Sequence, residues 1–221
     1  MSGAPVPEGR LAEGAWYASR QAGLLLEDAS RLFDAGRSGT AIALAMFARE
    51  EIGKARLLFG LAAETASGRK ITVVDVRAEC VDHEGKQEAA VFSISLSAPR
   101  DSAAAEIMKR VFSGEDSDDA REVLEQLGRL VQAKRRRTPS DRHEARLRAL
   151  YVDVRDDGAW SRPEDFDRQA ALGHLCDSLN DYSIISSNIQ QGRGAAPEVL
   201  RLILDWPDRP PLPPPSWPKT T

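Results

Sequence analysis

The stretch Ala41–Gly60, AIALAMFAREEIGKARLLFG, decides the fold of this chain. Its first half is apolar on every side of a helix, which is typical of a helix buried at the centre of a bundle. The second half carries Glu50, Glu51 and Lys54. Because an unpaired carboxylate inside a protein is costly, these charges are expected to be paired or to take part in chemistry.

The two glutamates face different sides of this helix. Glu50 and Lys54 are four residues apart, and we expect them to pair locally, a contact worth about 0.2–0.5 kcal/mol at a surface. Glu51 points about 100° away, on the side of Leu44 and Ala48, so we expect it to face the core. Glu51 is therefore predicted to take a cation from another helix, either as a structural ion pair or within a polar site.

The flanking sequence predicts an all-α, single-domain helical bundle, because apolar residues recur every three or four positions. The expected helices cover residues 8–34, 40–66, 72–97, 103–112, 117–131, 141–150, 161–191 and 197–205. Thr72 with Asp75 predicts a capping box, and Asp141 is expected to cap the sixth helix. Residues 151–160 are expected to form a loop or short hairpin around Asp157-Gly158.

The proposed helical domain spans residues 8–205, and residues 206–221 form a proline-rich tail. Seven prolines follow Trp206, so the tail is expected to be extended and solvated, although such a segment can also dock in an aromatic groove.

The net charge of −4 gives no general argument for nucleic-acid binding. Residues 134–148 nevertheless hold seven Lys and Arg against two acids, and such a basic strip attracts phosphate or is simply a solvated helix face. The strip includes Lys134, Arg135, Arg136, Arg137, Arg142 and His143.

The cysteines and the hydropathy indicate a soluble, cytoplasmic protein. Cys80 and Cys176 show no CxxC or His spacing, which predicts a reducing compartment and neither a zinc site nor a disulfide. We expect no metal and no cofactor. No signal peptide is visible, and the longest apolar run is far shorter than the roughly 20 residues of a membrane span, so no membrane contact is expected.

A second polar group follows in residues 75–89, DVRAECVDHEGKQEA. On a helix His83 shares a face with Lys86 and Gln87, and next to the charges of residues 50–54 these side chains could form a cluster inside the bundle. Such a cluster offers a group that titrates near neutral pH, as general acid–base chemistry needs, or it only locks the packing.

Three motifs together resemble the AbiV family of abortive-infection proteins: AIALAMFAREEIGKA, DHEGKQEA, and RLRALYVDVRDDGAW followed by Pro163. The resemblance covers residues 20–190. It implies a role in bacterial phage defence and a helical fold of the HEPN (higher eukaryotes and prokaryotes nucleotide-binding) superfamily. Many HEPN proteins are metal-independent ribonucleases that act as dimers and carry an Arg-x4–6-His motif.

The resemblance assigns the family's motifs to particular positions of this sequence. They are the acidic–lysine motif at Glu50, Glu51, Gly53 and Lys54, the His/Lys motif at His83 and Lys86, Arg146, and the LYVD motif at Leu150, Tyr151, Val152 and Asp153. The nuclease spacing fits both Arg77-x5-His83 and Arg137-x5-His143. Arg77 and His83 would lie about 120° apart on a straight helix, so that pair needs a bend.

The resemblance therefore implies a phage-defence effector, expected to be a homodimer through helix 8–34 or 161–191. Its implied activity is RNA binding or endoribonuclease action that halts translation, with His83, Lys86 and Arg77 as catalytic residues. Glu50, Glu51, Lys54, Arg146, Tyr151 and Asp153 would support them. Two alternatives stay open: a non-enzymatic helical protein that binds a phage or host protein, and nucleotide binding without cleavage.

Overall fold

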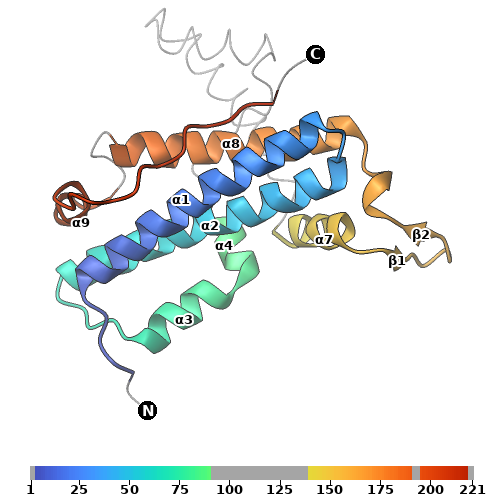
Figure 1. Cartoon of the computed structure of the whole chain (residues 1–221). Coiled ribbons are helices and arrows are strands. Elements are labelled where there is room, and N and C mark those ends of the chain that lie inside the picture. Colours follow the sequence, from blue (N-terminus) through green and yellow to red (C-terminus); the bar gives the residue numbers. More distant parts are fainter. Residues whose placement is uncertain (1–2, 91–138, 191–194, 219–221) are drawn as a thin grey trace, which may run out of the picture.

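Two long neighbouring helices, α1 (Glu8–Asp34) and α2 (Ser38–Ala66), form the centre of the computed structural model (Figure 1). The structure describes residues 3–90, 139–190 and 195–218. Gly36 ends α1 with a φ of 76°, a left-handed conformation that suits glycine at the end of a helix. Buried alanines face each other across the pair, so the two backbones can approach closely.

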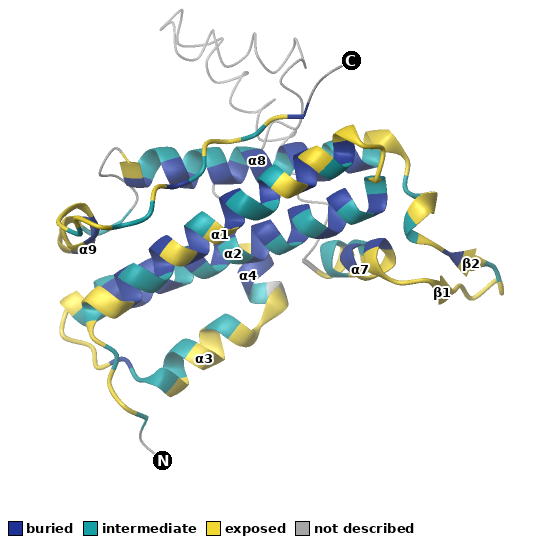
Figure 2. Cartoon of the chain, in the orientation of Figure 1, coloured by how far each residue is buried: buried dark blue, intermediate teal, exposed yellow. Residues whose placement is uncertain are grey.

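The other helices surround α2. It contacts α1, α8 (Arg168–Gln190), α4 (His83–Ala89) and α7 (Pro139–Leu150), which explains why its first half is apolar on every side (Figure 2). Outside this core lies α3 (Val73–Val81), which has no buried residue, whereas α9 (Pro197–Leu204) packs on α1 and contributes Val199 and Ile203 to the core. The described part of the chain is all-α apart from one short hairpin, as the sequence predicts.

That hairpin pairs β1 (Asp153–Val154) with β2 (Trp160–Ser161) in antiparallel register, with Val154 opposite Trp160. Gly158 has a φ of 79° in the connecting turn, so the predicted hairpin around Asp157-Gly158 is confirmed. The 3₁₀ turn η1 (Pro163–Asp165) then leads into α8.

Several predicted helix boundaries need correction. The helix expected from Thr72 begins with the predicted capping box but ends at Val81, because Asp82 is extended and its carbonyl starts α4 by accepting the main-chain N–H of Lys86 (3.1 Å). The helix expected from Asp141 begins at Pro139, a residue that favours the first helical position. The helix expected from residue 161 begins as η1. The helices expected over 103–112 and 117–131 lie outside the described residues.

The prediction of a solvated tail is wrong for residues 206–218. This segment runs along α1 and α8 in extended conformation (Figure 1), and Leu212 is buried in the core. Proline carbonyls lack main-chain partners in such a segment, and here side chains of α1 and α8 donate to them. No helix in the described ranges is long and apolar enough to cross a membrane.

Gly53 sets the distance between α2 and α4. A Cβ atom at this position would lie 1.8 Å from the carbonyl oxygen of Lys86, so only glycine permits the α4 backbone to approach so closely. Gly60, on the same helix, is exposed and has nothing within 4 Å of the corresponding Cβ position. The glycine of the acidic–lysine motif therefore positions His83 and Lys86.

We expect Gly53→Ala to lower the free energy of unfolding by about 1–3 kcal/mol, because the added methyl group forces α4 away from α2. The matched variant Gly60→Ala should instead raise it by about 0.5–1 kcal/mol, the usual gain of alanine over glycine within a helix. Urea denaturation followed by circular dichroism measures both. Equal effects of the two substitutions would contradict the close approach.

Candidate functional site

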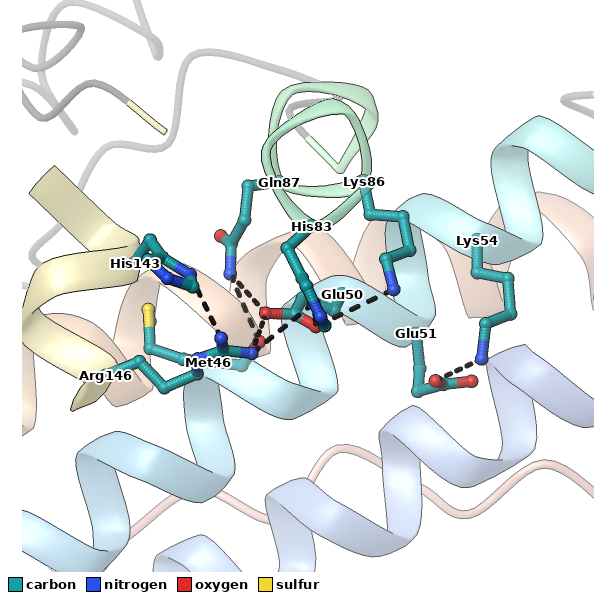
Figure 3. Close-up of polar contacts among 9 residues, drawn as sticks. All are labelled: Met46, Glu50, Glu51, Lys54, His83, Lys86, Gln87, His143 and Arg146. Atoms are coloured by element: carbon teal, nitrogen blue, oxygen red, sulfur yellow. Dashed lines mark hydrogen bonds and ion pairs between the residues drawn. The ribbon is translucent and has the colours of Figure 1, made fainter. Parts of the chain in front are cut away.

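Glu50 lies at the centre of a cluster built from three helices (Figure 3). Glu50 is only 5% exposed, and its carboxylate meets cationic or ionisable side chains from both α4 and α7. Arg146 Nη1 donates to Oε1 over 2.6 Å, His83 Nδ1 lies 2.7 Å from Oε2, and Lys86 Nζ lies 3.8 Å from Oε2. We call Glu50, His83, Lys86, Gln87, His143 and Arg146 the Glu50 cluster.

The structure exchanges the predicted roles of the two glutamates. Glu50 is the buried carboxylate that takes cations from other helices, whereas Glu51 is half-buried and pairs with Lys54. Both Glu51 and Lys54 point away from the cluster (Figure 3) and line a groove of about 540 Å³ with residues of α1 and α3. The prediction failed because α4 and α7 also cover the Glu50 side of α2, which periodicity alone marks as exposed.

The face shared by His83, Lys86 and Gln87 meets α2 as predicted. Gln87 is buried, and its amide donates weakly to the carbonyl oxygen of Met46 (3.4 Å) and to Glu50 Oε1 (3.5 Å). Together with the close approach at Gly53, these contacts fix α4 along α2.

The two histidines of the cluster lie side by side, with ring centroids 6.1 Å apart. The His83 side chain is 50% exposed, and His143 is partly buried on α7. His83 Nδ1 lies 2.7 Å from Glu50, which only accepts, and 3.5 Å from Arg146 Nη1, which only donates. The shorter contact assigns the hydrogen to Nδ1 and leaves Nε2 for other partners. Because a guanidinium only donates, Arg146 Nη2, 3.0 Å from His143 Nδ1, leaves the hydrogen of a neutral His143 on Nε2.

The permanent charges of the cluster sum to a positive value, because Arg146 and Lys86 face the single carboxylate of Glu50. Both cations are buried, and Arg146 also lies over the ring of Phe47, 5.4 Å from its centroid. An excess positive charge inside the protein favours anions over cations near it, and the two partly exposed histidines are the accessible side of the cluster.

Other predicted site residues lie elsewhere. Arg77 is exposed on α3 and makes no hydrogen bond or ion pair with the described residues of the cluster, although the break at Asp82 supplies the bend that its pairing with His83 required. Tyr151 and Asp153 are exposed beyond the end of α7, and Asp153 accepts the main-chain N–H of Val154 (2.8 Å). Arg142 lies on α7 next to His143. Lys134, Arg135, Arg136 and Arg137 lie outside the described residues.

The cysteines offer little chemistry. Cys80 and Cys176 are free thiols, and burial raises the pKa of each, which keeps the thiol protonated at neutral pH. Within the described ranges no three His, Cys, Asp or Glu side chains are grouped to hold a metal ion.

Sequence reasoning missed a second buried ion pair and the position of His143. Arg49 Nη1 lies 2.7 Å from Asp181 Oδ2, which ties α2 to α8, and the signal was an arginine inside an apolar run. The sequence pattern had placed His143 in the basic strip of residues 134–148 instead. Its spacing of three residues from Arg146 puts both side chains on one face of α7, and that spacing could have placed it in the cluster.

Comparison with known families gives one finding: the model of the family described as AbiV, a HEPN family, matches residues 10–180. The match includes the three helices that build the Glu50 cluster. No curated protein and no solved structure matches the chain.

We expect Glu50→Gln to lower the free energy of unfolding by about 3–5 kcal/mol, because it leaves Arg146 and Lys86 buried without a counter-ion. Glu51→Gln, which breaks the half-buried pair with Lys54, should cost about 1 kcal/mol or less. Chemical denaturation of both variants measures the difference. A Glu50→Gln chain as stable as Glu51→Gln would show that the buried cations do not depend on this carboxylate.

Proposed function

We propose, since this chain belongs to the AbiV family of HEPN-like abortive-infection proteins, that it cleaves RNA in the cytoplasm of phage-infected cells and so halts translation. Membership of the family makes the protein a phage-defence protein. The proposal adds the reaction: metal-independent endonucleolytic cleavage of RNA at the Glu50 cluster.

The observation that carries the proposal is the environment of His83. Its ring is half exposed, while its Nδ1 is held by a carboxylate that is itself buried and fixed by Arg146. A neutral imidazole in this position presents the lone pair of Nε2 to a bound ligand, and the carboxylate stabilises the imidazolium that forms when Nε2 takes a proton. These are the properties of a general base.

In the proposed reaction His83 Nε2 takes the proton of a ribose 2′-hydroxyl, and the resulting oxygen attacks the adjacent phosphorus. The bond from phosphorus to the 5′-oxygen breaks, and that oxygen takes a proton from water. The products are a 2′,3′-cyclic phosphate and a 5′-hydroxyl end, and His83 returns its proton to the solvent. The Nε2–H of His143, which lies beside His83, donates to a phosphate oxygen throughout.

Arg146 and Lys86 support the reaction electrostatically. Negative charge builds up on the phosphorane oxygens, and buried cations stabilise it strongly because the protein interior screens charge poorly. Arg146 and Lys86 already pair with the carboxylate of Glu50, which is therefore not available as a metal ligand. Their two positive charges exceed its single negative charge, and this excess repels divalent metal ions. This arrangement supports a reaction without a metal.

We expect His83→Ala to reduce RNA cleavage by about 10²–10⁴-fold, the usual contribution of a general base, while the melting temperature changes little because the ring is half exposed. His143→Ala should weaken cleavage to a smaller extent, through loss of one phosphate contact. The measurement is the cleavage of labelled single-stranded RNA by purified protein, with and without a metal chelator.

Arg77→Ala is the matched control, because Arg77 is an exposed cation outside the cluster and its loss should leave cleavage unchanged. A 2′,3′-cyclic phosphate on the product identifies the proposed reaction. RNA that stays intact at every protein concentration would remove the proposal, and full activity of the His83→Ala chain would remove its assignment to this site.

A second candidate function is binding of a phage or host protein without catalysis. The exposed apolar side chains at the end of α7 and on the hairpin favour it, since such patches mark interaction surfaces: Leu147, Tyr151, Val152, Val154 and Trp160. A homodimer is also part of our proposal, and light scattering of the purified chain tests it. Defence that is lost on Trp160→Ser but kept on His83→Ala would favour the binding function.

A further inference from the structure

The C-terminal strap, residues 206–218, is held by its main-chain carbonyls. Trp16 Nε1 on α1 donates to the carbonyl of Pro210 over 2.8 Å, and the Tyr182 hydroxyl on α8 donates to that of Pro213 over 2.6 Å. The hydroxyl of Ser30 on α1 donates to the carbonyl of Ser216. Burial raises the pKa of Tyr182, so its hydroxyl stays protonated and able to donate.

The three accepting carbonyls, at residues 210, 213 and 216, recur every third residue. A left-handed polyproline helix has three residues per turn, so these carbonyls lie on one side of it. Proline fixes φ near −65° and biases the residue before it toward the same extended conformation, so a sequence this rich in proline favours that helix.

The α1 face that receives the strap has a matching repeat. Trp16, Gly23 and Ser30 are each seven residues apart, which is close to two helical turns, so they lie on one face. Trp16 and Ser30 are separated by about 21 Å along the axis of an α-helix. Six residues of a polyproline helix, from Pro210 to Ser216, span about 19 Å. The spacing of the accepting carbonyls along the strap therefore matches the spacing of Trp16, Gly23 and Ser30 along α1.

Gly23, at the middle of this face, makes room for the strap. A Cβ atom there would lie 2.3 Å from the Tyr182 hydroxyl oxygen and 3.1 Å from Cδ of Pro213. Glycine at this position allows the Tyr182 hydroxyl on α8 to reach the carbonyl of Pro213 in the strap.

Two side chains of the strap, three residues apart, anchor it further. Leu212 is only 7% exposed and belongs to the hydrophobic core. Arg209 lies over the ring of Trp16, 5.4 Å from its centroid. Its guanidinium donates to the carbonyls of Ile203 and Leu204 at the end of α9 and to that of Trp206 at the start of the strap.

We propose that the face formed by α1 and α8 is a recognition site for a left-handed polyproline helix, and that the chain's own strap occupies it. The ligand class is a proline-rich segment with an arginine and a leucine three residues apart and with carbonyls free at every third position, as in residues 209–216. The site is independent of the ribonuclease proposal, since it shares no residue with the Glu50 cluster.

The test uses the full chain carrying Leu212→Asp, which weakens its own strap, and a fluorescent peptide with the native sequence of residues 206–218. We expect saturable binding in fluorescence anisotropy. The wild-type chain should bind the peptide at least tenfold more weakly, because its own strap competes at a high effective concentration. A peptide that carries the Leu212→Asp change should not bind.

Tyr182→Phe, added to the Leu212→Asp chain, should weaken peptide binding about tenfold through loss of one hydrogen bond. Ser183→Ala is the matched control, since this neighbouring hydroxyl donates to the carbonyl of Leu179 within α8, and it should change nothing. Circular dichroism verifies folding, and Leu212→Ala replaces Leu212→Asp if the latter unfolds. A folded strap variant that does not bind the peptide, or that binds it equally well with and without the Tyr182→Phe change, would overturn the proposal.

Discussion

The packing of α4 and α7 against α2 depends on one buried carboxylate. Glu50 is nearly inaccessible to water, and an ionised carboxyl group in that position is stable only with cations and hydrogen-bond donors around it. The chain supplies them from distant parts of the sequence, with Arg146 on α7 and with His83, Lys86 and Gln87 on α4. This requirement brings three helices to one point, and the same convergence produces the candidate site.

Much of this arrangement could be predicted from the sequence, because it follows from local patterns. The extents of α1 and α2 follow from helical periodicity and the glycine between them, and the shared face of His83, Lys86 and Gln87 follows from helix geometry. The choice between Glu50 and Glu51 could not be predicted in this way. When every side of a helix is covered, its apolar residues no longer indicate which polar residue is inside, and only the neighbours of α2 decide it.

The strap shows a different limit of sequence reasoning. Composition indicates that a proline-rich segment has no core of its own, which is correct, but it does not indicate what the segment can bind. The relevant signal is divided between two places: a three-residue repeat of carbonyls in the strap and a seven-residue repeat of Trp16, Gly23 and Ser30 in α1. Neither repeat is recognisable until the two segments are known to lie together.

A structural and a catalytic role for the Glu50 cluster do not exclude each other, because its members differ in exposure. Arg146 and Lys86 are buried against Glu50, so their contribution to stability is large and any effect on a ligand is indirect. The His83 ring is half exposed although its Nδ1 is bound to the same carboxylate. A rigid buried charge that holds an accessible imidazole is what preorganised acid–base chemistry requires. The buried contacts of Glu50 that stabilise the domain therefore also orient the His83 ring. The exposed edge of that ring is the part of the cluster that would act on a substrate.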